Sequence, residues 1–166
     1  MRIVIVIVMS LGLLSSYAFG ADGCTAAKKK AVCTDDIVKE KTKWAADLVK
    51  AKGKDSTAEI KKLRYDCCGE PDYIWINTCD PVKMVMHPIK PMLDRKDVTG
   101  NKDPDGKAIF VEFCKAAKAS SDGCAWVDYK WTKFGDKDPT DKKSWVCLVP
   151  AGTTNAKWLV DSGTWK

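Results

Sequence analysis

The sequence predicts an exported α+β domain in which helices lie on an antiparallel sheet. Three observations support this fold class. An apolar leader precedes the rest of the chain. Helical and β-rich patterns then follow in the order helix, helix, two strands, helix, three strands. The remainder, roughly 145 residues, suffices for one domain with a single core, and no internal repeat or interdomain linker interrupts it.

Residues 1–20 have the composition of a secretory signal peptide. Arg2 supplies one early charge, an apolar stretch too short to span a membrane follows, and Ala18-Phe19-Gly20 supplies small residues for cleavage before Ala21. We therefore expect a signal peptide at 1–20, an N-terminal segment at 21–34 and the folded domain at 35–166. The mature protein would then be periplasmic or secreted, with no membrane span.

Helical spacing of apolar residues predicts three helices. The first begins at Asp35 or Asp36 and ends at Gly53. A capping box at residues 56–59 begins the second, and Asp103-Pro104 begins the third. The apolar faces are expected to carry Ile37, Val38, Trp44, Ala45, Leu48 and Val49, then Ile60 and Leu63, then Ile109, Phe110, Phe113, Ala116 and Ala117.

Five β-rich segments complete the sheet. Residues 73–77 and 83–86 form a hairpin across the turn-prone segment 79–81. The other three strands are expected at 124–131, 144–149 and 157–160, the last with an extension towards Trp165, and residues 133–143 are expected to form a polar loop. In the strand at 124–131, Val127, Tyr129 and Trp131 share one face, while Trp126, Asp128 and Lys130 share the other.

All eight cysteines follow the leader, and an even number in an exported chain predicts a disulfide framework. Spacing leaves the pairing open. Vicinal Cys67 and Cys68 could form an exchange centre, although two neighbours more often pair elsewhere. Because paired Cys-x-x-Cys motifs are missing and His87 is the single histidine, we expect neither a metal nor a cofactor. The framework cysteines are Cys24, Cys33, Cys67, Cys68, Cys79, Cys114, Cys124 and Cys147.

The charges indicate a solvated surface. The formal net charge is +6, but lysines alternate with aspartates, as in residues 133–143, and arginines are very few. This pattern argues against nucleic-acid binding. No Ser, His and Asp pattern and no metal motif suggests catalysis, so we expect that the protein is not an enzyme.

The loop after the predicted hairpin is the first candidate site. His87 precedes Pro88 and Lys90 precedes Pro91, which keeps both residues out of the α region. Two donor side chains on a proline-stiffened loop beside an aromatic hairpin predict an anion site. The alternative is a capped hairpin followed by a solvated loop.

Longer stretches resemble a known family. The segment MVMHPIKPMLDRKDVTGNKDPDGKAIFVEFCKAAKA, then WVDYKW, KSWV and residues 158–165 are similar to the small single Cache domain. This is a PAS-like sensor module of bacterial chemoreceptors and histidine kinases that also occurs as a stand-alone exported protein. The resemblance covers about 35–166, and His87-Pro88-x-x-Pro91, residues 102–107 and residues 128–131 are its most specific parts. It implies a PAS-like antiparallel sheet of about five strands, a long N-terminal helix and a helix between strands two and three, here stabilised by disulfides.

The resemblance also implies a function. Cache domains bind small molecules, frequently short carboxylates such as acetate, propionate, pyruvate or lactate, between the sheet and a loop. A stand-alone module would pass its signal to a separate membrane receptor or kinase. The implied ligand-binding residues are His87, Lys90, Tyr129 and Trp131, with Tyr73 and Trp75 as walls, although the aromatic residues would be core in any small sheet domain.

The chain also departs from the family pattern. Thr132-Lys133-Phe134 stands where relatives have prolines, and residues 161–164 replace a glycine-rich last strand. Cys114 and Cys124 are atypical as well. These differences keep open an alternative, a secreted disulfide-rich protein-interaction module that retains the Cache scaffold without a small-molecule ligand.

Overall fold

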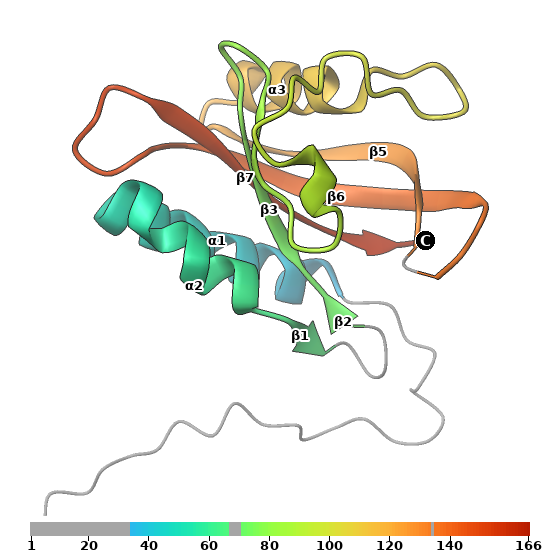
Figure 1. Ribbon diagram of the computed structural model, residues 1–166, viewed down its shortest axis with the longest axis horizontal. Coiled ribbons are helices and arrows are strands. Elements are labelled where there is room, and N and C mark those ends of the chain that lie inside the picture. Colours follow the sequence, from blue (N-terminus) through green and yellow to red (C-terminus); the bar gives the residue numbers. More distant parts are fainter. Residues whose placement is uncertain (1–33, 67–70, 134) are drawn as a thin grey trace, which may run out of the picture.

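The computed structural model describes residues 34–66, 71–133 and 135–166, which form a five-stranded antiparallel sheet between helices (Figure 1). The strand order is β4-β3-β7-β6-β5. The predicted α+β class is confirmed. The strands are β3 (Ile74–Thr78), β4 (Met84–Met86), β5 (Cys124–Thr132), β6 (Pro139–Pro150) and β7 (Lys157–Trp165).

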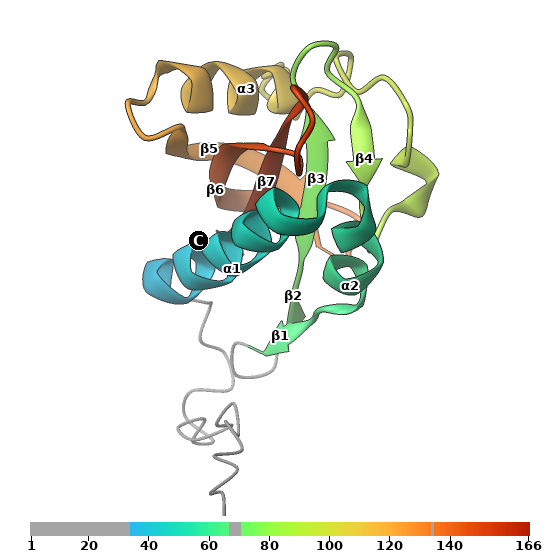
Figure 2. The ribbon, with the colours of Figure 1, turned by 90° about the vertical axis from the view of Figure 1, so that its left-hand side faces the viewer.

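Helices cover both faces of this sheet. Helices α1 (Asp35–Lys52) and α2 (Thr57–Lys62) lie on one face and α3 (Ile109–Ala119) on the other, as the two perpendicular views agree (Figures 1 and 2). The long N-terminal helix and the helix between the second and third strands of the sheet are therefore both present. Smaller elements are η2 (Gly53–Ser56), η3 (Pro91–Leu93) and the paired strands β1 (Tyr65–Asp66) and β2 (Pro71–Asp72), which the sequence had not suggested.

Helix α1 begins and ends within one residue of its predicted limits. Its cap is Thr34 rather than an aspartate, because the Thr34 hydroxyl accepts a hydrogen bond from the amide of Ile37 (3.4 Å). Gly53, with φ 55°, ends the helix. The prediction for Trp44 is wrong, since its side chain is 38% exposed. The buried stripe runs instead through Val38, Thr42, Ala45, Ala46 and Val49.

One predicted cap and one predicted helix start are also wrong. Helix α2 begins at Thr57, directly after Ser56 as expected, but the Ser56 hydroxyl donates to the carbonyl of Gly53 (2.6 Å) and forms no capping box. The third helix begins at Ile109 rather than at Asp103. The Asp103 carboxylate instead accepts backbone hydrogen bonds from Asp105, Lys107 and Lys130, which fixes the preceding turn against β5.

The predicted loop at 133–143 is partly wrong, because β6 already begins at Pro139. Residues 139–143 pair with β5 on one side, and Lys142 pairs with Trp165 of β7 on the other. Non-local pairing therefore overrides a polar composition that by itself favours a loop. The extension of the last strand to Trp165 is confirmed.

The two sheet faces have separate cores. Strand alternation sends Ile76 and Val160 towards α1, and Trp75 and Leu159 towards α3. On the α1 side the core is largely aliphatic. On the α3 side it is rich in aromatic rings, including Phe110, Phe113 and Tyr129.

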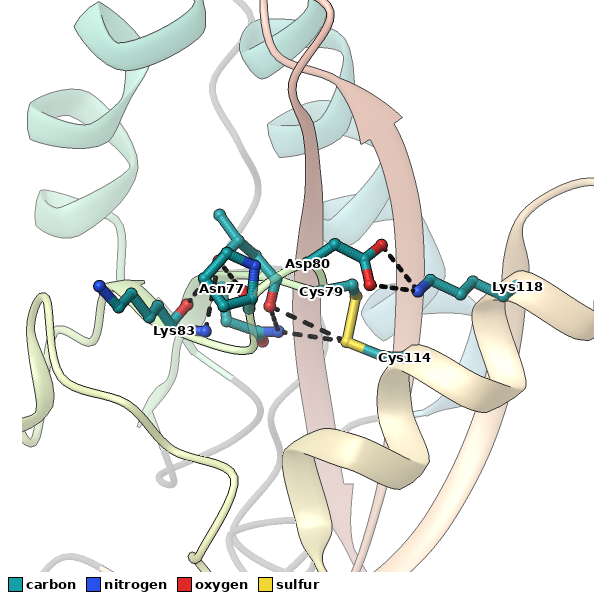
Figure 3. The surroundings of a disulfide bond; sticks show 8 residues. Asn77, Cys79, Asp80, Lys83, Cys114 and Lys118 are labelled. Carbon is teal, nitrogen blue, oxygen red and sulfur yellow. Dashed lines mark hydrogen bonds and ion pairs between the residues drawn. A yellow bond between two sulfur atoms is a disulfide. The ribbon is translucent and has the colours of Figure 1, made fainter.

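Two disulfides lie within the described part of the chain. Cys79–Cys114 links the end of β3 to α3, beside an ion pair between Asp80 and Lys118 (Figure 3). Cys124–Cys147 links β5 to β6. The other four cysteines, Cys24, Cys33, Cys67 and Cys68, and the expected signal peptide at 1–20 lie outside the described residues. Within the described residues, no helix has the length and apolarity that crossing a membrane requires.

Candidate ligand-binding site

A small cavity lies on the α3 side of the sheet. Five of the six residues that the sequence proposed as ligand contacts line it, and α3 supplies the rest of the wall. The sixth, Lys90, adjoins it, because its Nζ lies 4.1 Å from the ring centroid of Trp131. The lining residues are Tyr73, Trp75, His87, Ile109, Phe110, Phe113, Tyr129 and Trp131.

The His87 ring occupies the centre of an aromatic cluster. It stacks on Trp75 of β3 with a centroid distance of 5.9 Å and on Trp131 of β5 at 6.3 Å. Tyr73 contacts it at 5.2 Å. The histidine therefore bridges two non-adjacent strands, which no local pattern in the sequence could indicate.

The loop fixes both the position and the tautomer of His87. Its amide donates to Asp94 Oδ1 (2.6 Å), while Asp94 Oδ2 pairs with Lys61 Nζ (3.1 Å). The ring Nδ1 accepts from the amides of Ile89 (3.3 Å) and Lys90 (3.0 Å). Since Nδ1 is an acceptor, the neutral ring carries its proton on Nε2.

His87 is neutral at ordinary pH. Its side chain is 2% exposed, and burial, followed by the positive charges of Lys142, Lys90 and Arg64, lowers its pKa to about 3. The ring therefore offers a ligand a neutral Nε2–H donor. Any positive charge for an anion must come from elsewhere.

Lys90 supplies one such charge at the edge of the cavity. Its backbone, at φ −121° and ψ 68°, is outside the α region, as expected before Pro91. Partial burial and the charge of Lys142 lower the pKa of Lys90. The two ammonium groups therefore act on the same space.

Lys142 is the functional candidate that the sequence interpretation missed. It lies on β6 opposite Tyr129 and Trp165 and is 0% exposed. Its Nζ is 4.6 Å from the Tyr73 ring centroid and 4.4 Å from that of Trp165, and it donates to Tyr73 Oη (3.4 Å). The available signal was strand alternation from Val146 back through Ser144, which the charged composition of residues 139–143 obscured.

Beneath the cavity, the sheet contains buried polar groups without hydrogen-bond partners. Asp161 pairs in register with Trp75, and neither its carboxyl oxygens nor Trp75 Nε1 has a partner among the described residues. Burial raises the pKa of Asp161 well above its usual range, which favours the neutral form of this carboxyl. By contrast, the Tyr129 and Ser144 hydroxyls bond to each other at 2.9 Å.

The cavity is small. The space open to the centre of a water molecule is about 10 Å³, which is room for about one water. A two- or three-carbon acid is larger, so its entry requires side chains around the cavity to move. The arrangement of hydrogen-bond donors and cations suits a small anion, and the described residues contain no cluster of potential metal ligands.

Comparisons with known proteins give a consistent picture of relatives. The family model of the Cache domain matches residues 33–164. The methyl-accepting chemotaxis protein McpP of Pseudomonas putida is 39% identical over 107 residues, which are 64% of this chain and 18% of that protein. The chain thus spans less than a fifth of this curated relative.

Solved structures share the fold. A periplasmic sensor domain of a chemotaxis protein has a TM-score of 0.65 at 30% identity, covering 78% of this chain and 93% of its own. A structure described as the structural basis for carboxylic acid recognition by a Cache chemosensory domain has a TM-score of 0.65 at 29% identity, covering 78% and 91%. A methyl-accepting chemotaxis protein from Vibrio parahaemolyticus, at 14% identity and a TM-score of 0.60 over 78% and 84%, is similar in fold alone.

Proposed function

This chain belongs to the Cache-domain family, whose members are extracytoplasmic ligand-sensing modules, and we propose that it is an exported, non-enzymatic sensor for a short carboxylate. A structural neighbour described in terms of carboxylic acid recognition supports the ligand class. The proposed signal passes to a separate membrane receptor or kinase. The proposed contacts are His87, Lys90, Tyr129 and Trp131, with Tyr73 and Trp75 as walls.

One observation carries this proposal: cations surround an aromatic cavity whose histidine is a neutral donor. Lys90 lies over Trp131 and Lys142 over Tyr73. None of the ion pairs formed within the described ranges includes either lysine. A buried carboxylate needs charge-assisted donors to offset its desolvation, and these groups would supply them.

The apolar lining supports a short ligand. Trp75 and Trp131 line the cavity, and Phe110 and Phe113 line it from α3. Such a wall suits an alkyl or acyl end of two or three carbons, while a few polar groups fix the carboxylate.

Titration calorimetry of the exported, oxidised protein with acetate, propionate, pyruvate and lactate tests the proposal. Replacing both donors, His87→Gln with Lys90→Met, should weaken binding by a factor of at least about 100, because each charge-assisted hydrogen bond contributes on the order of 1.5–3 kcal/mol. Lys130→Met is a matched control, since this lysine pairs with Asp105 on the other face of β5. Its affinity should equal that of the parent.

Two results would reject the proposal. Unchanged binding in the double variant would remove His87 and Lys90 from the site. No binding of any of the four acids by the parent protein would favour the alternative, an interaction module that keeps the scaffold without this ligand.

The affinity should hardly change between pH 5 and 8. His87, which faces Lys142, Lys90 and Arg64, has a pKa of about 3 and stays neutral throughout this range. A histidine that had to be protonated would instead lose affinity as pH rises through its pKa. Calorimetry at pH 5, 6.5 and 8 separates the two cases.

A further inference from the structure

We propose that the ammonium group of Lys142 is the principal anchor of the ligand carboxylate, and that Gly163 provides the space through which Lys142 reaches it. This inference rests on the proposed carboxylate-binding function. It moves the centre of charge from the loop to the sheet beside the cavity, where Lys142 contacts the lining residues Tyr73 and Trp75. It gives Lys90 the secondary role of a residue at the rim.

Lys142 carries a buried charge that has no ion-pair partner among the described residues. The side chain is 0% exposed, and none of the ion pairs within residues 34–66, 71–133 and 135–166 includes it. It contacts the faces of Tyr73, Trp75 and Trp165 and donates one long hydrogen bond to Tyr73 Oη. Aromatic faces stabilise a cation far less than burial destabilises it, so an anionic ligand here would offset part of the cost of burying this charge.

Lys142 lies next to the cavity. Tyr73 and Trp75, which Lys142 contacts, line the cavity. The charge of Lys142 also lowers the pKa values of both His87 and Lys90, so its field reaches the two donors on the loop. A carboxylate at Lys142 would relieve this mutual repulsion and would lie within reach of the Nε2–H of His87.

The side chain of Lys142 crosses β7. Lys142 starts on β6, yet its Nζ lies over the rings of Tyr73, which precedes β3, and of Trp75 on β3. It crosses at Gly163, where a Cβ would meet Ser144 Oγ first, then the Lys143 carbonyl oxygen at 2.6 Å and Lys142 Cε at 2.8 Å. Because the φ of Gly163 is not in the left-handed region, space and not backbone conformation requires glycine here.

The neighbouring residue provides a matched control. Lys143 is on the same strand but on the opposite face, where it pairs with Asp35 at 2.6 Å and lies over the ring of Trp126. Removing its charge alters the net charge of the protein by the same amount. Lys143→Met therefore isolates position from charge.

The test combines calorimetry with thermal unfolding for Lys142→Met, Lys90→Met and Lys143→Met, with acetate, propionate, pyruvate and lactate as ligands. Lys142→Met should weaken binding by a factor of about 100 or more, Lys90→Met by about 10, and Lys143→Met by less than about 2. Without ligand, Lys142→Met should melt at the same or a higher temperature than the parent, because it removes a buried charge. If Lys142 had only a structural role, its replacement would lower the melting temperature.

The outcomes separate the two proposals. If the parent binds no acid, the proposed function fails. If the parent binds and Lys142→Met binds within threefold of it, the function stands and the role of Lys142 is overturned. Should Lys142→Met not fold, Lys142→Gln, which keeps a hydrogen-bond donor for Tyr73 but no charge, gives the same decision.

A double-mutant cycle tests Gly163 as a positioning residue. Gly163→Ala should weaken binding, and in a background of Lys142→Met the further loss should be smaller, because the ammonium group that it displaces is already missing while its contacts with Ser144 and the Lys143 carbonyl remain. Additive losses would mean that Gly163 only supports the sheet, and that part of the inference would be wrong.

Discussion

The two faces of the sheet differ in how completely their buried polar groups are paired. Towards α1, the hydroxyl of Thr42 donates to the Val38 carbonyl (2.8 Å), and Ser162 bonds to both Tyr65 and the Tyr73 carbonyl. Towards α3, a lysine and a carboxyl are buried without ion pairs in the described structure. All buried side-chain atoms found without partners, on Trp75, Asn77 and Asp161, lie on strand positions that face α3.

We interpret the α1-side core as serving stability and the α3-side core as serving a binding site. Buried groups without partners each cost about 1–3 kcal/mol, so a face that collects them is less stable than its packing would allow. An aliphatic face with satisfied polar groups has no such burden. Changes on the α1 face should therefore affect stability alone, whereas changes on the α3 face should affect binding and stability separately.

The largest expected effect concerns the covalent link that holds α3 on its face. Replacing Cys79 and Cys114 by alanine opens a loop with a sequence separation of 35 residues. Chain entropy predicts a loss of about 4 kcal/mol in the free energy of unfolding. Denaturant unfolding of the double variant measures it. The equivalent change at Cys124 and Cys147, with a separation of 23, should cost slightly less.

Comparing the two double variants requires that both disulfides form. None of the described cysteines has a free thiol. Thiol labelling of the denatured, unreduced protein, followed by peptide mapping, should therefore leave Cys79 and Cys114 unlabelled. Labelling of either residue would contradict the disulfide framework.

Ile76→Ala should produce the second largest effect, confined to the α1 face. Ile76 is fully buried in the aliphatic core, and such a truncation costs about 2–5 kcal/mol. The affinity for the four acids should stay within twofold of the parent. Met92→Ala, at a side chain 79% exposed, is the control and should change stability little. A large loss of affinity in Ile76→Ala would show that the faces are coupled.

The sequence predicted the apolar residues of both faces better than the buried charges of the α3 face, for a physical reason. Helix spacing and strand alternation are local signals, and they correctly identified Val38, Ala45 and Val49 on α1 and Phe110 and Phe113 on α3. The prediction for Trp44 failed because hydrophobicity alone does not determine which large side chain of a helix faces the solvent. The order of elements and the five strands followed from the same local signals and from the family resemblance.

The buried charged residues beside the cavity could not be predicted in this way. A lysine in a charged segment is ordinarily exposed, and Lys142 is buried only because β6 lies between two strands and Gly163 leaves room for its side chain. Asp161 is buried by the same central position of β7. The six predicted contacts were found through the loop and the resemblance, and their binding role stays a prediction.

A third prediction separates two buried groups of the α3 face by pH. The pKa of His87 is lowered on folding, so its contribution to stability falls as pH decreases from about 6.5. The pKa of Asp161 is raised on folding, so its contribution falls as pH increases above about 4. Between pH 4 and 6.5 the two slopes oppose each other, each by up to about 1.4 kcal/mol per pH unit.

Single variants should reveal these slopes. Relative to the parent, Asp161→Asn should gain stability as pH rises from 4.5 to 6.5, and His87→Gln should lose it. The charged groups that face His87, which are Lys142, Lys90 and Arg64, remain in both variants. Urea unfolding at three pH values gives the differences. Parallel curves for the parent and both variants would contradict the buried, neutral state of these groups.

The smallest expected effect tests the direction of the side chains on β5. Tyr129 is buried against the cavity and bonds to Ser144, whereas Asp128 is exposed and pairs with Lys166 at 2.9 Å. Tyr129→Phe removes one hydroxyl and should reduce ligand affinity by a factor of up to about 10, since a hydrogen bond contributes about 1 kcal/mol. Asp128→Lys reverses a charge, but the side chain at this position points away from the site, so affinity should change by less than about twofold. If Asp128→Lys has the larger effect in calorimetry, the ligand lies on the opposite face of β5, and the contrast between the two faces fails.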